Sequence, residues 1–223
     1  MDLFGESRSS AWERIDLPGA DLRWMPHWLS PDEASQWLAN LRDTTPWEVH
    51  RIRIFGREVD SPRLSCWIGD AEATYTYSRT RFEPHPWSAS LNGLRQRVEA
   101  VCAARFNSVL ANLYRDGNDS MGWHSDDEAE LGSQPVIASL SLGAARSFRF
   151  RSREDKRAVR SLELPSGSLL CMAGDTQRLY QHDLPKRRGL TDARINLTFR
   201  CIGMADKRTV RDETDGARST GIT

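Results

Sequence analysis

The sequence predicts an α+β fold in which a sandwich or jelly roll of β-strands is backed by helices. Three observations support this fold class. Two segments with helical spacing of apolar residues come first, many short β-type runs follow, and no helical segment separates those runs. Helices followed by consecutive strands, without βαβ alternation, are typical of antiparallel sheets covered by helices on one side.

The two predicted helices have clear sequence signals. The segment WLSPDEASQWLANL, residues 28–41, offers Ser30 as N-cap, Pro31 in the first turn and Glu33 three residues after the cap. This arrangement is a capping box. A second helix is predicted from about residue 88 to 105. Its apolar face repeats at helical spacing through Leu91, Leu94, Val98, Val101 and Cys102.

After the second helix the sequence changes to short β-branched or alternating runs, which predict strands. Turn signals such as RDGND and PSGS separate them. The runs are NSVLANLY (107–114), VIASLSLG (136–143), SFRFR (147–151), LELPSGSLLCMAG (162–174) and RINLTFR (194–200).

The chain of 223 residues suits one domain, which we place at residues 21–202. We expect residues 1–20 to form a flexible lead and the polar residues 203–223 to form a disordered tail. No apolar run is long enough to span a membrane, and the four cysteines are far apart. We therefore expect a cytoplasmic protein without membrane contacts. We further expect it to be bacterial and monomeric. The 31 basic and 31 acidic residues give no overall nucleic-acid signal.

The stretch GWHSDDEAE, residues 122–130, holds four carboxylates within five positions of this neutral chain. A solvated charge run would explain it, and so would a bound cation. His124 and Asp126 are two residues apart, so in an extended segment they point to the same side. With a second histidine, for which His182 is the best candidate, they would form a 2-His-1-carboxylate iron site. The alternative is a surface histidine in an acidic turn.

The run RINLTFR alternates apolar and polar residues. As a strand it directs Ile195, Leu197 and Phe199 to one face, whereas its other face carries two arginines, an amide and a hydroxyl. These polar residues are Arg194, Asn196, Thr198 and Arg200. Buried, they would suit a small dicarboxylate; exposed, they would form a basic sheet face. Asn112 and Tyr114 also share a strand face and can donate to a carboxylate.

Taken together, these motifs resemble the AlkB family of Fe(II)- and 2-oxoglutarate-dependent dioxygenases, over roughly residues 20–202. The resemblance implies a double-stranded β-helix core, or jelly roll, with supporting N-terminal helices and a nucleotide-recognition lid at about residues 50–80. It also implies an iron site and a 2-oxoglutarate site. The implied iron ligands are His124, Asp126 and His182, and the implied 2-oxoglutarate residues are Asn112, Tyr114, Arg194, Asn196, Thr198 and Arg200, with the assignment of each arginine left open.

The same resemblance implies oxidative demethylation of N-alkylated bases such as 1-methyladenine and 3-methylcytosine in DNA. The reaction uses Fe(II), O2 and 2-oxoglutarate, and it releases an aldehyde, succinate and CO2. It needs no catalytic side chain beyond the iron centre. The alternatives are the same chemistry on RNA or on another substrate, and a binding module that has lost activity.

Within the lid, the resemblance to the paralogue that repairs duplex DNA implies several substrate contacts. Tyr75 and Tyr77 would place a ring over the flipped base, unless they are a cross-strand aromatic pair. Phe55 would act as a wedge in duplex DNA, unless it belongs to a strand core. Arg63 and Ser78 are further lid contacts. We therefore expect single-stranded and duplex DNA as substrates.

The remaining charges have separate interpretations. Asp127 and Glu128 would meet the positive charge of an alkylated base. Seven basic residues within 146–160, together with the PKRRG segment at 185–189, could follow phosphates. The alternative for these basic residues is a scatter of surface arginines.

Overall fold

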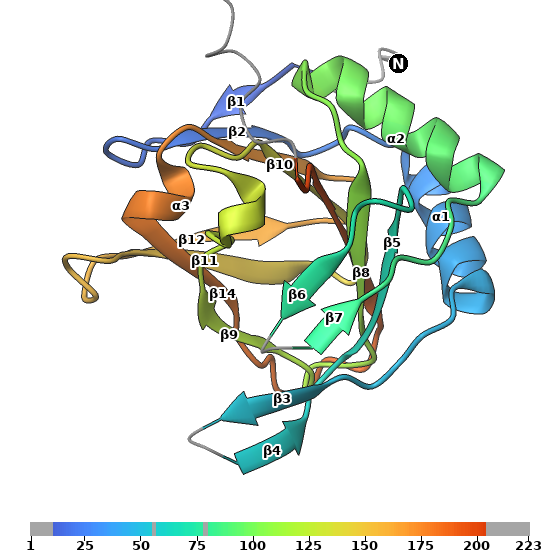
Figure 1. Ribbon diagram of the computed structural model, residues 1–223. Coiled ribbons are helices and arrows are strands. Elements are labelled where there is room, and N and C mark those ends of the chain that lie inside the picture. The colour runs from blue at the N-terminus through green and yellow to red at the C-terminus, as the bar shows by residue number, and fades with distance from the viewer. Residues whose placement is uncertain (1–10, 55–56, 78–79, 204–223) are drawn as a thin grey trace, which may run out of the picture.

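The fold of this protein, a computed structural model that describes residues 11–54, 57–77 and 80–203, has three layers (Figure 1). Two long helices cover one face of a seven-stranded antiparallel sheet, and a four-stranded antiparallel sheet covers its other face. Two further hairpins lie beside this sandwich. The predicted α+β jelly-roll class is confirmed.

The helices are α1 (Pro31–Thr44), α2 (Ala89–Cys102) and the short α3 (Thr176–Leu179), with a 3-10 turn η1 (Ala129–Leu131). The larger sheet has the strand order β1 (Glu13–Arg14), β2 (Asp21–Met25), β13 (Leu169–Ala173), β10 (Ile137–Gly143), β15 (Arg194–Arg200), β8 (Ser108–Tyr114), β5 (Leu64–Gly69). The smaller sheet has the order β12 (Val159–Leu164), β11 (Arg146–Ser152), β14 (Tyr180–Leu184), β9 (Met121–His124). The hairpins are β3 (Arg51–Ile54) with β4 (Arg57–Asp60) and β6 (Tyr75–Tyr77) with β7 (Thr80–Phe82).

Both long helices begin at a serine cap. The Ser30 hydroxyl accepts a hydrogen bond from the Glu33 backbone N–H at 3.2 Å, as the capping box predicts. Ser88 caps α2 in the same way through Leu91 at 3.2 Å. The second helix ends at Cys102, three residues before the predicted end, because Ala103 adopts a left-handed conformation with φ 51°.

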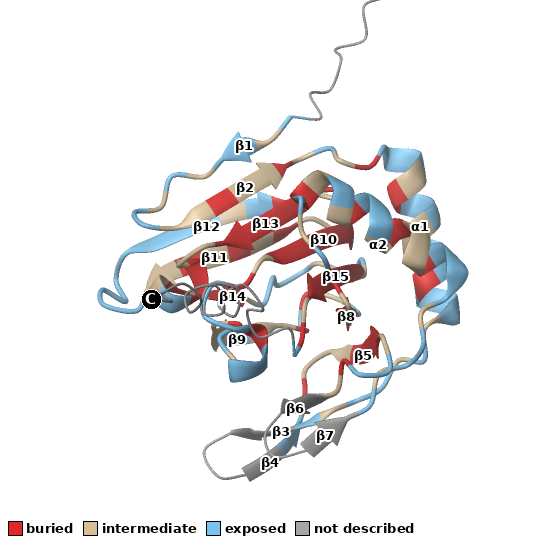
Figure 2. Cartoon of the chain, turned by 45° about the horizontal axis from the view of Figure 1, so that its top comes forward, coloured by how far each residue is buried: buried red, intermediate tan, exposed pale blue. Residues whose placement is uncertain are grey.

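Two apolar clusters hold the layers together, and Figure 2 shows the buried strands between the helices and the smaller sheet. The first cluster joins α1 and α2 to the larger sheet and contains Ile195, Leu197 and Phe199, all fully buried. The second joins the two sheets and contains Phe148 and Phe150. Strand β15 lies inside the larger sheet, between β10 and β8. Its apolar face packs in the cluster on the helix side, and its polar face is directed at the smaller sheet.

The ordered fold begins before residue 21, where the sequence placed the end of a flexible lead. Strand β1 pairs with β2, and the hydroxyl of Tyr180 donates to the Pro18 carbonyl at 2.8 Å. Ile15 and Leu17 pack against the cluster between the sheets. Their burial explains why this segment is held in place. The predicted tail lies outside the described residues from 204 onward.

The predicted lid corresponds to the two hairpins and the strand between them. Hairpins β3–β4 and β6–β7 each form a separate two-stranded sheet. They lie next to one another beside β8 and β9 (Figures 1 and 2). Phe55 and Ser78 lie outside the described residues. None of the helices in the described ranges is both long and apolar enough to cross a lipid bilayer.

Candidate active site

The two predicted histidine ligands face each other on neighbouring strands of the smaller sheet. His124 of β9 and His182 of β14 are register partners, and their ring centroids are 4.2 Å apart. Asp126 follows β9 by two residues. Its Oδ1 lies 4.0 Å from His124 Nε2, and its Oδ2 lies 3.9 Å from His182 Nε2. The three ligand atoms lie within 4.8 Å of one another, so a single ion could bind all three.

Surrounding groups fix the orientation of these three side chains. His124 Nδ1 lies 2.8 Å from the Gly122 carbonyl oxygen, which leaves Nε2 directed at the cluster. The Phe148 ring stacks on His182 with centroids 5.1 Å apart. Arg200 donates to Asp126 Oδ1 at 2.5 Å, from the opposite sheet. The cluster is therefore held from both layers of the sandwich.

The electrostatics of the cluster suit a divalent metal. Burial lowers the pKa of His124, and it lowers that of His182 to about 3, so both rings are neutral at pH 7. Burial alone would raise the pKa of Asp126, but the charge of Arg200, followed by the two histidines, outweighs it and the pKa is lowered. Neutral imidazoles and an ionised carboxylate are the protonation states that metal binding requires.

The polar face of β15 points into the space between the sheets. Its four residues are between 1% and 8% exposed, which excludes the alternative of an exposed basic face. Hydrogen bonds connect three of them in a row. Arg194 donates to Asn196 Oδ1 at 2.7 Å, and the Asn196 amide nitrogen donates to Thr198 Oγ1 at 2.8 Å. The row leads toward Arg200 beside Asp126.

Arg194, at the far end of this row, has unused hydrogen-bonding capacity. Its guanidinium is 1% exposed and lies 5.4 Å from the centroid of the Tyr114 ring. Its Nε has no hydrogen-bond partner among the described residues, and none of their acidic side chains forms an ion pair with it. Burial lowers the pKa of Arg194 to about 10. A buried cation with an unused donor has the charge and the hydrogen-bonding capacity that an anion requires.

Comparisons with known proteins agree with this geometry. A family model described as the 2OG-Fe(II) oxygenase superfamily matches residues 21–200. The chain is 36% identical over 212 residues to the DNA oxidative demethylase ALKBH2 of Homo sapiens, covering 91% of this chain and 81% of the relative. The chain belongs to the AlkB family. The solved structure of OsALKBH1 shares the fold of this family member, with a TM-score of 0.63 at 16% identity over 86% of this chain and all of that one.

A second group of relatives is longer than this AlkB-family chain. This chain is 43% identical over 186 residues to the alpha-ketoglutarate-dependent dioxygenase alkB homolog 3 of Rattus norvegicus. The matched residues cover 79% of this chain and 62% of that relative. The chain therefore spans less than two thirds of the length of these relatives. Those relatives come from mammals, and an ALKBH2 of Arabidopsis thaliana is 34% identical over 224 residues.

The family name implies Fe(II) and 2-oxoglutarate, and the residues of this AlkB-family protein fit both. Two neutral imidazoles and one carboxylate are the facial donor set of non-haem Fe(II) oxygenases. The unpartnered Nε of Arg194 and the buried polar face of β15 fit a dicarboxylate. The donor set and the anion site lie on opposing sheets, joined by the bond between Arg200 and Asp126.

The predicted substrate residues differ in their positions and in the contacts that they make. Arg63, expected in the lid, donates through Nε to Asn112 Oδ1 at 2.8 Å and so contacts the predicted 2-oxoglutarate residues. Asp127 forms an ion pair with Arg153. Glu128 is half-buried and is the N-cap residue of η1. Tyr75 and Tyr77 both lie in β6.

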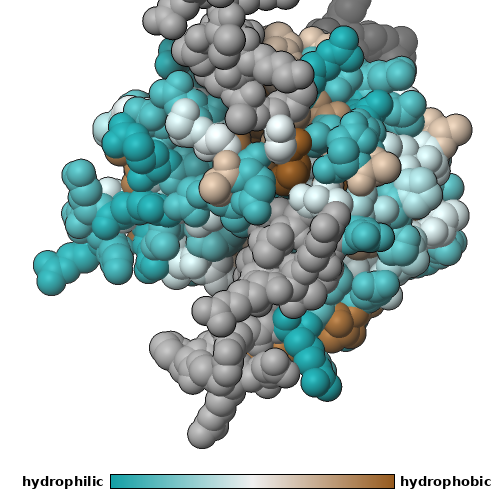
Figure 3. Space-filling model, viewed as in Figure 1, coloured by the Kyte–Doolittle hydropathy of each residue, from teal (hydrophilic) through white to brown (hydrophobic). Residues whose placement is uncertain are grey.

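Two arginines of β11, in the basic run that could follow phosphates, form hydrogen bonds within the protein. Arg149 forms a two-pronged ion pair with Asp183 at 2.8 and 2.5 Å. Arg151 donates twice to the Gln181 side-chain oxygen. Both guanidiniums lie over the ring of Trp123, at 5.1 and 4.3 Å. On the face seen in Figure 3, the described surface is mainly hydrophilic with small hydrophobic areas.

Three residues of the site were not predicted from the sequence. Ser141 accepts from Arg194 at 2.9 Å, and Ser139 donates to Asn196 at 3.0 Å. Both could have been found, because they alternate with apolar residues in VIASLSLG and so face the same side as each other. The third is Gln177, whose side-chain oxygen accepts from the Asp126 N–H at 3.0 Å. No periodic pattern marks it.

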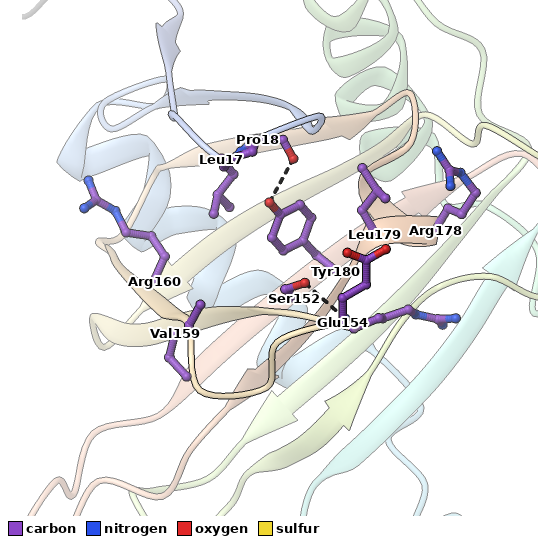
Figure 4. Close-up of a pocket in the computed structure, with 11 residues that line it drawn as sticks. Leu17, Pro18, Ser152, Glu154, Val159, Arg160, Arg178, Leu179 and Tyr180 are labelled. Carbon is purple, nitrogen blue, oxygen red and sulfur yellow. Dashed lines mark hydrogen bonds between the residues drawn. The ribbon is translucent and has the colours of Figure 1, made fainter.

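A separate hollow of about 630 Å³ lies beside the loop that joins β11 to β12 (Figure 4). Leu17, Val159 and Leu179 line it together with Arg160 and Tyr180. None of the predicted metal or 2-oxoglutarate residues lines this hollow. It is therefore distinct from the site between the sheets.

Proposed function

We propose that this protein is an Fe(II)- and 2-oxoglutarate-dependent dioxygenase that oxidatively removes alkyl groups from bases in DNA. The observation that carries the proposal is the cluster of His124, Asp126 and His182, joined through Arg200 to a buried anion site on β15. The relatives named as DNA oxidative demethylases support DNA as the substrate. We further propose that the protein works as a monomer on single-stranded and duplex DNA.

We further propose that the two arginines bind different ends of 2-oxoglutarate. Arg200 is next to the iron ligand Asp126, so it would face the carboxylate nearest the metal. Arg194 lies six residues away on the same strand face and has an unused Nε. It would take the distal carboxylate, with Tyr114 beside it. Charge-assisted hydrogen bonds of this kind are about twice as strong as neutral ones.

In this proposal the side chains bind and orient, whereas Fe(II) and O2 together supply the oxidising chemistry when bound. His124, Asp126 and His182 would hold the metal on one side and leave its other positions accessible. Arg194 and the amide of Asn196 would fix the co-substrate. The burial of the β15 face, with Thr198 8% exposed, would keep water from competing for these donors.

The proposed substrates are N-alkylated bases such as 1-methyladenine and 3-methylcytosine. Alkylation at these positions gives the base a positive charge, which Asp127 and Glu128 would attract. The target base must leave the helix stack to reach the metal. The ion pair between Asp127 and Arg153 implies that this aspartate must exchange partners before it can contact a base.

The deciding experiment combines the purified protein with Fe(II), 2-oxoglutarate and O2. Oligonucleotides carrying 1-methyladenine or 3-methylcytosine would be supplied as single-stranded DNA, duplex DNA and RNA. We expect loss of the methyl group with release of one succinate and one formaldehyde per repaired base. Succinate formation without demethylation of any of the three would contradict the nucleic-acid substrate, and the absence of both would contradict the reaction class.

The duplex activity depends on the proposed wedge at Phe55. The variant Phe55→Ala should lose most activity on duplex DNA and keep most of it on single strands, because only duplex needs its gap filled. Initial rates on matched single-stranded and duplex oligonucleotides measure this ratio. Equal losses on both substrates would remove the wedge from the proposal.

A further inference from the structure

We propose that Gln177 is a positioning residue that fixes the iron ligand Asp126 through its main chain. This inference depends on the proposed metal site and adds a residue that neither the motif nor the family resemblance identified. The contact is the hydrogen bond from the Asp126 N–H to Gln177 Oε1, at 3.0 Å.

The need for this contact follows from the path of the chain. Strand β9 ends at His124, so Asp126 lies beyond the hydrogen-bonded ladder of the smaller sheet. Asp126 is only 3% exposed. A buried backbone N–H without a partner costs about 1–3 kcal/mol. Gln177 supplies the acceptor that the sheet does not.

Gln177 is itself held rigidly. It is 2% exposed, and its amide nitrogen donates to the sulfur of Met172 at 3.5 Å. The preceding residue, Thr176, anchors α3 to the larger sheet. Its hydroxyl donates to the Ala173 carbonyl at 2.6 Å and accepts from the Asp21 N–H at 3.1 Å. The position of the Gln177 acceptor is therefore set by β2 and β13.

Asp126 is thus held both at its side chain and at its main chain. Arg200 holds its carboxylate at 2.5 Å, and Gln177 holds its main chain at 3.0 Å. With only the carboxylate held, the residue could pivot about that bond and shift relative to His124 and His182. Groups that orient a ligand in this way typically contribute 10–100-fold to metal affinity.

The test uses Gln177→Met, which preserves the approximate length of the side chain and removes the oxygen acceptor. Gln177→Asn serves as a second variant, because it withdraws the acceptor and keeps an amide. Gln134→Met is the matched control, since Gln134 bonds Asp175, which precedes α3, and is exposed. Metal-free protein of each variant is titrated with Co²⁺ without 2-oxoglutarate, following the visible absorption of the bound ion.

We expect both Gln177 variants to bind Co²⁺ roughly 10–100-fold more weakly, with an altered absorption spectrum, and Gln134→Met to match the wild type. Thermal unfolding of the metal-free proteins separates loss of fold from loss of positioning. Wild-type affinity and spectrum in the Gln177 variant that folds, or an equal loss in Gln134→Met, would overturn the inference. If the wild type and Asp126→Ala bind Co²⁺ equally, the proposed metal site itself is wrong.

Discussion

The two arginines of β15 occupy equivalent positions at opposite ends of one buried strand face, yet their surroundings differ. Arg200 is 4% exposed and forms an ion pair with Asp126 at 2.5 Å. Arg194 is 1% exposed and donates to the neutral acceptors Ser141 and Asn196. The guanidinium at the Asp126 end therefore has an acidic partner within the chain. At the distal end, no acidic side chain of the described residues forms an ion pair with Arg194, and its Nε has no hydrogen-bond partner.

Removing the carboxylate at the metal end should have the largest effect. In Asp126→Ala the guanidinium of Arg200 stays buried without its acidic partner, which costs about 3–5 kcal/mol. We expect this loss in the free energy of unfolding of the metal-free protein, measured with urea, together with loss of Co²⁺ binding. An unchanged unfolding midpoint would mean that Arg200 finds another partner or reaches water.

Removing the cation at the distal end should weaken ligand binding and spare the fold. We expect Arg194→Met to weaken 2-oxoglutarate binding by roughly 10–100-fold, because hydrogen bonds to charged groups are worth about 1.5–3 kcal/mol. Calorimetric titration of 2-oxoglutarate into Co²⁺-loaded protein measures this change. Co²⁺ affinity should stay at the wild-type value.

The stability of Arg194→Met provides a second test of the difference between the two ends of β15. Burying a charge without an opposite charge beside it costs free energy, so its replacement by an apolar side chain of similar length removes that cost. The metal-free Arg194→Met protein should therefore unfold at the same urea concentration as the wild type or a higher one. A loss as large as that of Asp126→Ala would show that the two ends do not differ in the way described.

A smaller loss of stability than in Asp126→Ala is expected behind the distal end, in the loop after β8. Burial alone would raise the pKa of Asp119, but the hydrogen bonds and charge of Arg115 outweigh it and the pKa is lowered. A lowered carboxylate pKa gives stability that is present above the ordinary value of 3.8 and lost as the pH falls through the folded-state value.

Asp119→Asn should therefore destabilise the protein by about 1–2 kcal/mol at pH 7. The difference from the wild type should shrink as the pH falls below 3.8, the ordinary carboxyl value. Urea unfolding at a series of pH values measures both quantities. A difference that does not depend on pH would mean that the charge of Asp119 is not what stabilises the loop.

Much of the site could be predicted because its residues follow local periodicity. The alternation of RINLTFR predicts which face of β15 is polar, and the spacing of His124 and Asp126 predicts that they lie close together. The structure places both groups as expected. The sequence alone left open whether the β15 face was buried, because that depends on the opposing sheet.

The features that were missed depend on contacts between distant segments. Gln177 and Asp126 are separated by 51 residues and come from different elements. The ion pair of Asp127 with Arg153, which comes from the loop after β11, was not predicted. The early start of the fold depends on Ile15 and Leu17 finding a place between the sheets. No periodic pattern in the sequence marks any of these contacts.

The two hairpins at the position of the predicted lid have a consequence for how such an enzyme could change over evolutionary time. Neither β3–β4 nor β6–β7 shares a ladder with the sheets that carry His124, His182 and the two arginines of β15. Changes of sequence or length in these hairpins therefore need not alter the strand pairing of β9, β14 or β15. A single oxidising core could in this way acquire new nucleic-acid preferences through its periphery.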